Sequence, residues 1–356
     1  MAKAPPHPLS LLFSPLLSPL LSLGALLLGA LLGLYAAGPA LGAGPVREVA
    51  VRARPLPLNP RDPGAGRVGR LGFLGALELR SDDRRFGGLS GMLFDDRCQR
   101  LLAVADSGSW IVLEPVEEDG RLVDVRRGWI APILDMAGAP PASKAAADAE
   151  EVARTANGDV FVSYEQRHRL ERFRGLSPCD PETLARPPVA RHVLAETGSW
   201  PANGGAEAVA ALGDGLLLLS EAAADGEGRR QGLHWSPEAP VGRFSRPVPK
   251  GYQPTAMDLF DDGDGRSHLL VLHRHASLLG GLSAVVDETV FAGDPAEAPE
   301  GRVVARLGPP LTVDNMEALA VRRQAGRVFL YLASDDNFNP LQRTVLLKFE
   351  LLPEGS

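Results

Sequence analysis

Carboxylate side chains recur at matching positions in four of five related segments of this sequence. Glu151, Glu207 and Glu317 each stand at the start of an apolar run, while Asp106 and Asp335 follow apolar runs. Carboxylates that converge repel one another unless protons or a cation compensate their charge. Calcium suits a flexible cage of carboxylate oxygens, so the three glutamates are predicted to hold calcium. Asp106 or Asp335 is predicted to orient a water molecule as a base.

Basic and nucleophilic residues offer further chemistry. Arg274 takes the place of an acid in the fourth segment, and its planar guanidinium matches a phosphate or carboxylate group, so we predict a substrate contact. Ser90 lies in GLSG (88–91), one residue short of the GxSxG elbow and before a strand rather than a helix. A nucleophilic serine would need a positioned histidine such as His273. His273 and His275 could form a zinc pair, but no third ligand stands at a diagnostic spacing, which favours ordinary polar residues at a strand end.

The five segments share one plan, which indicates an internal repeat. Each contains an acidic or small residue, an apolar strand, a polar turn, a second apolar strand and a polar cluster. Their spacing of roughly 50 to 60 residues lies near that of propeller blades. The segments are 87–108, 148–168, 204–223, 253–277 and 314–336.

Short strands after each hairpin bring the unit to four strands, which predicts an all-β fold, a β-propeller of four-stranded blades. After the fifth hairpin only one clear strand remains, at 344–352. We therefore expect the strand at 70–80 to enter the last blade and close the ring. This arrangement gives five blades. Residues 46–58 could supply further strands, so six blades remain the alternative.

The hairpin geometry predicts where the polar positions meet. The first and last residues of an antiparallel hairpin lie at the same end, so both sets should ring one mouth of the central channel. The turns, including the one with Cys98, should face the opposite side. The alternative to a metal site is a ring of solvated carboxylates bonded to neighbouring loops. The predicted positions are Ser90, Glu151, Glu207, Met257 and Glu317 at the hairpin starts, and Asp106, Glu165, Glu221, Arg274 and Asp335 at the ends.

Composition limits the partners. A net charge of −7 argues against nucleic acid, because phosphate neutralisation needs a basic surface. A hydrophobic content of 45% with 23% charged residues is typical of a folded, soluble body. Cys98 and Cys179 are the two cysteines of the chain. They could pair in an oxidising compartment, or each could stay free and buried.

The first 43 residues differ from the rest and predict export. Lys3 and His7 precede an apolar run from Leu20 to Ala37, followed by small residues. This order is typical of a secretory signal, although the run is nearly long enough for an uncleaved membrane anchor. The predicted organisation is therefore a signal or anchor at 1–43, a linker or N-terminal strand at 44–69, and the propeller at 70–356. We expect a periplasmic or secreted body that meets the membrane only through its N-terminal segment.

Several of these motifs resemble the phytase-like domain family, exported bacterial proteins described as having "esterase-like activity of phytase". The similarity covers roughly residues 70 to 352, by the repeat boundaries. It implies a propeller with phosphoesterase or esterase potential, but no particular substrate. The motifs that carry it are GGLSGMLFDDRCQRLLAVADSG (87–108), AEEVA, AEAVA, QPTAMDLF and DNMEALAV followed by YLASDDNFN.

Together these features predict a monomeric hydrolase of phosphate or carboxylate esters that acts on a small anionic or ester substrate. Calcium at the channel mouth would assist hydrolysis. The alternative is a non-catalytic propeller, an envelope scaffold or a small-ligand-binding module, because the same fold hosts both roles.

Overall fold

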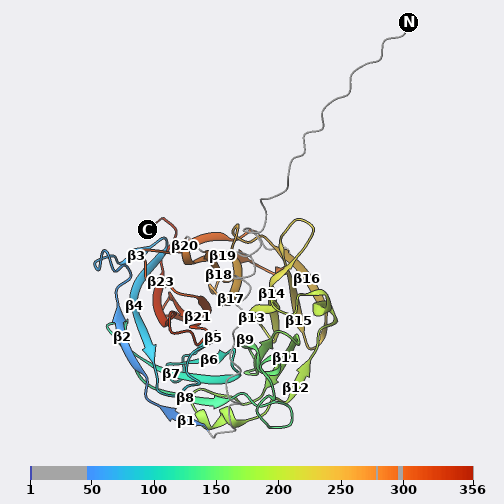
Figure 1. Ribbon diagram of the computed structural model, residues 1–356, viewed down its shortest axis with the longest axis horizontal. Helices are drawn as coiled ribbons and strands as arrows, with labels where there is room; N and C mark the ends of the chain where they lie inside the picture. Colours follow the sequence, from blue (N-terminus) through green and yellow to red (C-terminus); the bar gives the residue numbers. More distant parts are fainter. Residues whose placement is uncertain (2–45, 278–279, 296–299, 356) are drawn as a thin grey trace. The chain divides into compact units, whose positions relative to one another are not determined.

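Five antiparallel sheets surround a central axis in the computed structural model, which describes Met1 and residues 46–277, 280–295 and 300–355 (Figure 1). The sheets are the blades of a five-bladed β-propeller, so the predicted fold class and blade number are confirmed. Apart from Met1, the predicted signal or anchor at 1–43 lies outside the described residues. No described helix is long and apolar enough to cross a membrane.

Each blade begins with its inner strand and continues outward. Blade 1 contains β5 (Leu89–Asp95), β6 (Arg100–Ala105), β7 (Ser109–Glu118) and β8 (Arg121–Pro132). Blade 2 contains β9 (Ala149–Arg154), β10 (Val160–Tyr164), β11 (Arg169–Phe173) and β12 (Ala190–His192). Blade 3 contains β13 (Ala206–Leu212), β14 (Gly215–Ala224), β15 (Arg230–Ser236) and β16 (Ala239–Arg246). Blade 4 contains β17 (Gln253–Asp261), β18 (Ser267–Ser277), β19 (Gly281–Phe291) and β20 (Arg302–Leu307).

Blade 5 combines the two ends of the propeller. Its first three strands are β21 (Met316–Gln324), β22 (Arg327–Ser334) and β23 (Thr344–Leu351), and its fourth is β4 (Leu71–Arg80). The β23 and β4 strands pair along their length, with Thr344 opposite Leu79 and Leu351 opposite Leu71. The predicted closure by the N-terminal strand is therefore confirmed.

Residues 46–58 do not form a sixth blade. They supply β1 (Arg47–Val49), which adds to the outer edge of blade 1 beside β8, and β2 (Arg52–Leu56), which adds to blade 5 beside β4. The two-residue strand β3 (Arg67–Val68) also pairs with β4. The described helices are short and lie between strands: α2 (Lys144–Ala147), η1 (Pro181–Ala185) and η2 (Ala195–Ser199).

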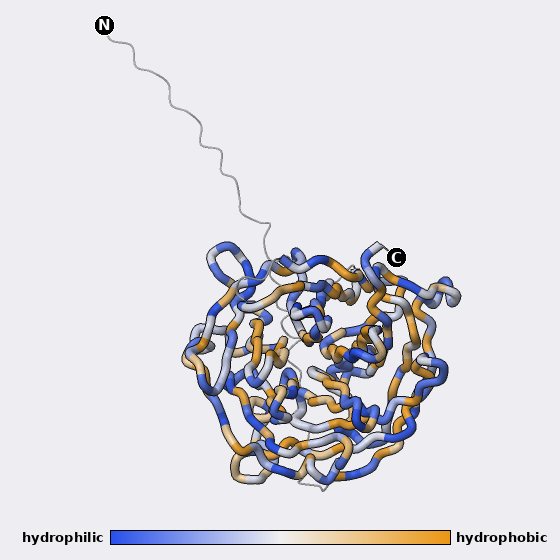
Figure 2. Tube along the Cα trace, turned by 180° about the vertical axis from the view of Figure 1, so that it is seen from behind, coloured by the Kyte–Doolittle hydropathy of each residue, from blue (hydrophilic) through white to orange (hydrophobic). Residues whose placement is uncertain are grey.

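The hydrophobic core is divided into five layers, one between each pair of neighbouring blades. Between blades 1 and 2, for example, Val104 and Trp110 pack with Val162 and Phe173. The layer between blades 5 and 1 includes residues of β4. The strand that closes the ring therefore also buries apolar side chains. Figure 2 shows hydrophobic stretches along the strands and hydrophilic segments in several peripheral loops. A strand with both faces buried between blades accounts for the near-continuous apolar runs of the sequence.

A disulfide joins blade 1 to the segment that follows blade 2's third strand. Cys98, in the turn between β5 and β6, is bonded to Cys179, 81 residues away. The sequence left pairing and burial as alternatives, and the structure shows the pair. An ion pair between Arg154 Nη1 and Asp95 Oδ2, 2.7 Å apart, links the same two blades nearby.

Removing this disulfide should destabilise the propeller without unfolding it at moderate temperature. The Cys98→Ser/Cys179→Ser double variant should lose about 2 to 4 kcal/mol of unfolding free energy, since the crosslink closes a long loop. Urea unfolding of the oxidised wild type, the reduced wild type and the variant measures this. Equal midpoints for oxidised and reduced wild type would contradict the expectation.

Candidate functional site

A β-bulge in the inner strand of every blade positions one set of polar side chains. In blade 1, Leu89 pairs with Ala105, but Gly91 pairs with Val104, so Ser90 is the extra residue. The same shift of one residue occurs near the start of β9, β13, β17 and β21. A bulge re-aims a side chain and bends the strand. The residues at the equivalent position are Ser90, Glu150, Glu207, Thr255 and Glu317.

This register differs from the predicted ring at two positions. Glu150 occupies the blade 2 position expected for Glu151, and Thr255 occupies the blade 4 position expected for Met257. The sequence held the signal for blade 2: Ala149-Glu150-Glu151-Val152-Ala153 aligns with AEAVA (206–210), which matches Glu150 with Glu207. The repeat was therefore aligned one residue out of register there. Because strand side chains alternate between faces, a shift of one residue changes what a side chain contacts.

Glu151 instead lies inside the ring of inner strands. It is only 1% exposed, and its Oε1 accepts hydrogen bonds from the backbone N–H groups of Met92 (3.1 Å) and Val152 (2.9 Å). Its carboxylate fills the space beside Gly91, where an added Cβ would lie 2.3 Å from Oε1. Burial raises the pKa of Glu151 well above its usual value. Glu151 thus joins blades 1 and 2 and is not one of the mouth carboxylates.

The second predicted set lies at the same end of the blades. Four of these residues directly follow the last pair of their hairpin, whereas Arg274 is itself part of the last pair, opposite Gln253. Backbone hydrogen bonds join the two ends of a hairpin: the Asp106 N–H donates to Gly88 O, and the Glu165 N–H donates to Asp148 O. Asp148 therefore lies with these residues, and it is an acid that the sequence analysis did not predict. The residues of this set are Asp106, Glu165, Glu221, Arg274 and Asp335. We call both sets, with Asp148, the channel mouth.

Arg274 balances the acids of blades 3 and 5. Its Nη2 lies 2.9 Å from Glu221 Oε1, and its Nη1 lies 3.3 Å from Glu317 Oε1. Nη1 also donates to Asn315 Oδ1 at 3.0 Å. Glu207, in blade 3, is also close enough to Arg274 for its negative charge to raise the pKa of the guanidinium. Arg274, which the sequence predicted to contact substrate, is thus already bonded to protein groups.

Blades 1 and 2 hold a denser cluster. The carboxylates of Asp148, Glu150 and Glu165 each offer an oxygen within 4.8 Å of the others, and all three side chains are buried. Lys144 Nζ lies 2.9 Å from both Asp148 Oδ1 and Asp106 Oδ2. The other oxygen of Asp106, Oδ1, is buried and accepts no hydrogen bond from the described residues.

The electrostatics favour a cation at this cluster. Burial, followed by the charges of Glu165, Asp148 and other acids, raises the pKa of Glu150 well above its usual value. Burial also raises the pKa of Glu165 to about 7, although the Gly204 N–H donates to it at 2.7 Å. Burial likewise raises the pKa of Asp335, Glu207 and Glu317, with neighbouring acids contributing. A divalent cation would favour the charged forms, and oxygen donors suit calcium, so the residues present fit the predicted metal.

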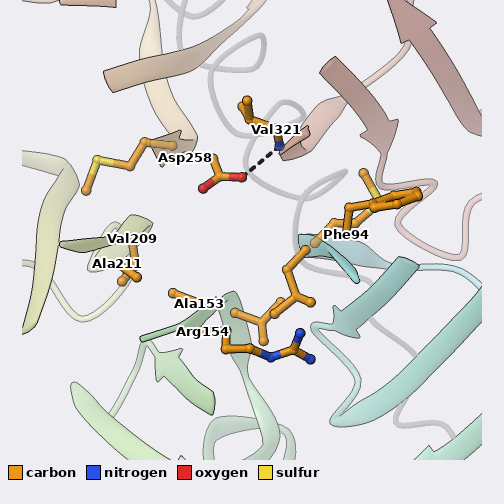
Figure 3. A pocket seen from close by; sticks show the side chains of 11 residues that line it. Phe94, Ala153, Arg154, Val209, Ala211, Asp258 and Val321 are labelled. Atoms are coloured by element: carbon orange, nitrogen blue, oxygen red, sulfur yellow. Dashed lines mark hydrogen bonds between the residues drawn. The ribbon is translucent and has the colours of Figure 1, made fainter. Parts of the chain in front are cut away.

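A cavity of about 220 Å³ lies among the inner strands, apart from the channel mouth. Figure 3 shows Asp258 pointing into it from blade 4, across from Ala153 and Val209. Asp258 Oδ2 accepts the Val321 N–H at 2.7 Å, and burial raises the pKa of Asp258 to about 6. Met257, predicted at the mouth, lines this cavity instead.

The other candidate residues have local partners. Ser90 Oγ donates to Gly88 O at 3.3 Å. His273 Nε2 lies 2.9 Å from Asp287 Oδ2, whereas His275 Nδ1 lies 2.6 Å from Gly251 O. The two histidines therefore bond to different groups: His273 is fully buried inside β18, and His275 lies nearer the end of that strand. The polar turn of the fourth segment, residues 262–266, connects β17 and β18.

The fold and site define an all-β propeller whose channel mouth carries eight carboxylates in the described structure, flanked by Lys144 and Arg274. The sequence matches the family described as "Phytase-like: Esterase-like activity of phytase" over residues 84–338. The chain belongs to this phytase-like family. No curated protein matches it.

Solved structures show only distant likeness. Virginiamycin B lyase from Staphylococcus aureus is 8% identical, with a TM-score of 0.40, over 85% of this chain and 100% of that one. A gluconolactonase from Xanthomonas campestris is 15% identical, with a TM-score of 0.35, over 89% of this chain and 99% of that one. Likeness this distant transfers no activity.

Gly91→Ala tests the contact that locks Glu151 between two blades. The added methyl would meet Glu151 Oε1 and Cα, so the variant should lose about 1 to 3 kcal/mol of unfolding free energy. Gly226→Ala is the matched control, because an added Cβ there has nothing within 4 Å. Chemical denaturation of both variants measures the difference. Equal unfolding free energies of the two variants would contradict this expectation, because the inner strands would then accommodate the methyl group without losing stability.

Glu165 should make the metal-free protein more stable as the pH falls. Its folded pKa of about 7 exceeds the usual 4.5, so its stabilising contribution is complete below about pH 4.5 and is lost as the pH rises to about 7. Glu165→Gln should flatten that part of the stability curve, whereas Glu238→Gln, at an exposed turn, should not. Thermal melting in a chelator across this range measures it; parallel curves for all three proteins would contradict the assignment.

Proposed function

We propose that this protein is an exported hydrolase of phosphate or carboxylate esters, with a calcium-assisted site at the channel mouth. The family described by its esterase-like activity supports the hydrolase class. The predicted N-terminal signal or anchor supports a periplasmic or secreted location. The observation that carries the site is the convergence of Asp148, Glu150 and Glu165 oxygens within 4.8 Å.

The proposed cation site is centred on blade 2. Glu207 and Glu317 were predicted as ligands together with Glu151, but Arg274 already compensates both. Of the three acids in blade 2, Asp148 is the one for which the described structure shows an ion pair, with Lys144. The acids with the least compensation are the ones that attract a cation most strongly. The preferred ligands of the proposed cation are therefore Asp148, Glu150 and Glu165. Glu207 and Glu317 are further ligands beside them.

Bound calcium would supply Lewis acidity toward a phosphoryl or carbonyl oxygen. The chain's own groups then have distinct tasks. Asp106 Oδ1 is buried and accepts no hydrogen bond from the described residues, so it can take a proton from an attacking water. Asp335 has a raised pKa beside Glu317 and Asp106, which suits it to hold a proton. Arg274 orients Glu221 and Asn315 and lends positive charge to an anionic substrate.

Glu150→Gln should abolish calcium-dependent turnover while leaving the fold intact. An amide is nearly isosteric with the carboxylate but removes one charge from the cluster, so calcium should bind at least about tenfold more weakly. Glu238→Gln is the control, because that exposed side chain lies at the turn between β15 and β16. The measurements are hydrolysis of phosphomonoesters and short-chain esters, with and without a chelator, and the shift in Tm with calcium.

The outcomes separate the two functional classes. Turnover that calcium restores and Glu150→Gln removes supports the hydrolase. A calcium-dependent rise in Tm without hydrolysis of any ester would instead favour a non-catalytic propeller, whose acidic ring serves a scaffold or a small-ligand site. An unchanged Tm at millimolar calcium would contradict the metal site in either class.

A further inference from the structure

We propose that the cavity among the inner strands binds a small organic cation, a primary ammonium group carried on a single apolar ring. Asp258 would bind the ammonium group, and the wall of the cavity would enclose the ring. This is a second site, separate from the acids of the channel mouth, and it does not depend on the proposed function.

The cavity has the size and the wall of a site for one apolar ring. Inner strands of all five blades contribute to it, and apart from Arg154 and Asp258 its eleven lining residues are apolar (Figure 3). An engineered apolar cavity of about 150 Å³ binds benzene. A volume of about 220 Å³ therefore leaves room for one ring and a short substituent.

The cavity opens at the end of the channel opposite the mouth. Its deepest side chains, Met92, Val152 and Met257, are each at most 3% exposed. Farther along the inner strands, toward the turns that lead to the second strands, Ala211 and Val321 are only half-buried. A ligand can thus enter from the turn side without passing the carboxylates of the channel mouth.

Asp258 is a carboxylate without a counter-charge in this apolar wall. Its Oδ1 accepts the Leu259 N–H and its Oδ2 accepts the Val321 N–H, both at 2.7 Å. Among the described residues it forms no ion pair, and burial raises its pKa to about 6. Each carboxylate oxygen can accept a further hydrogen bond. Because an unpaired charge in apolar surroundings costs free energy, an ammonium group that pairs with Asp258 would recover part of that cost.

The neighbouring ionisable groups leave the charge of Asp258 uncompensated. Glu151 is a second buried acid, and the charge of Asp258 contributes to raising its pKa. Arg154 is the one basic residue in the wall, but its Nη1 lies 2.7 Å from Asp95 Oδ2, so Asp95 balances it. The cavity therefore favours a positive ligand over a neutral or negative one of the same shape.

An ammonium ligand fits this wall better than a metal ion does. Calcium takes about six to eight oxygen ligands, and Asp258 is the one acidic residue that lines the cavity. A primary amine needs few acceptors, and its ring gains free energy by leaving water for the apolar side chains. The charge of Asp258 and the apolar wall thus select the two halves of one molecule.

The test compares benzylamine with its neutral analogue benzyl alcohol by isothermal titration calorimetry. The full-length protein is used at about pH 8, where Asp258 is ionised, with a chelator present. Benzylamine should bind at least about tenfold more tightly than benzyl alcohol, because a charge-assisted hydrogen bond is added. In Asp258→Asn the two affinities should come within about threefold of each other, since the charge is gone. Asp264→Asn is the matched control, because Asp264 is exposed in the turn after β17 and should leave the wild-type ratio unchanged.

A second variant tests the cavity itself. In Ala211→Leu the larger side chain takes the space of the ring, so both ligands should bind at least about tenfold more weakly. If Asp258→Asn folds poorly, as judged by its Tm, the wild-type preference for the amine and the loss in Ala211→Leu decide the matter. Equal wild-type affinities for amine and alcohol, no binding of the amine, or full amine affinity in Asp258→Asn would each overturn the proposal. Calcium binding that Asp258→Asn removes, without amine binding, would assign the cavity to an inorganic cation instead.

Discussion

Pairing of β4 with β23 is the constraint on which the rest of the structure depends. Each blade buries its apolar side chains only against its two neighbours, so an open ring would leave two apolar faces in water. The N-terminal strand provides the fourth strand of blade 5 and contributes side chains to two of the five core layers. Closure also covers the edge of β23 with a paired strand, β4. It also fixes the five inner strands around one axis, and this makes a shared site from distant segments.

Closure brings like charges together, and the channel mouth shows how the protein manages them. The bulges of three inner strands and the ends of four second strands place acids at the channel mouth. Arg274 compensates the acids of blades 3 and 5, while Lys144 compensates Asp106 and Asp148. The remaining excess of negative charge lies on Glu150 and Glu165, whose pKa values burial raises. The uneven distribution of the two basic side chains is the reason why we propose the cation site at these acids.

The repeat made most of the fold predictable. Hairpins of alternating apolar strands and Asp, Asn or Gly turns identified the blades, and the lone strand after the fifth hairpin identified the closure. The register within a strand was harder, because a bulge adds one residue without changing the apolar pattern. That is why Glu151 was placed where Glu150 lies, whereas Met257, also predicted at the mouth, lies two residues beyond the bulge residue Thr255. Gly91 supplies the physical reason for the difference, since its missing side chain leaves room for the Glu151 carboxylate between two blades.

The sequence by itself determined the class of fold, the five-fold repeat and the end of the blades at which the acids gather, because these follow from periodicity and from hairpin geometry. It also identified Asp106, Glu165, Glu221, Arg274 and Asp335 as one set. Only the tertiary structure decided which acids lie close enough to share a cation, and that Asp148 and Lys144 belong with them. Those contacts join side chains from different blades and from the loop between them, and their distances depend on how the ring closes, which no local pattern encodes.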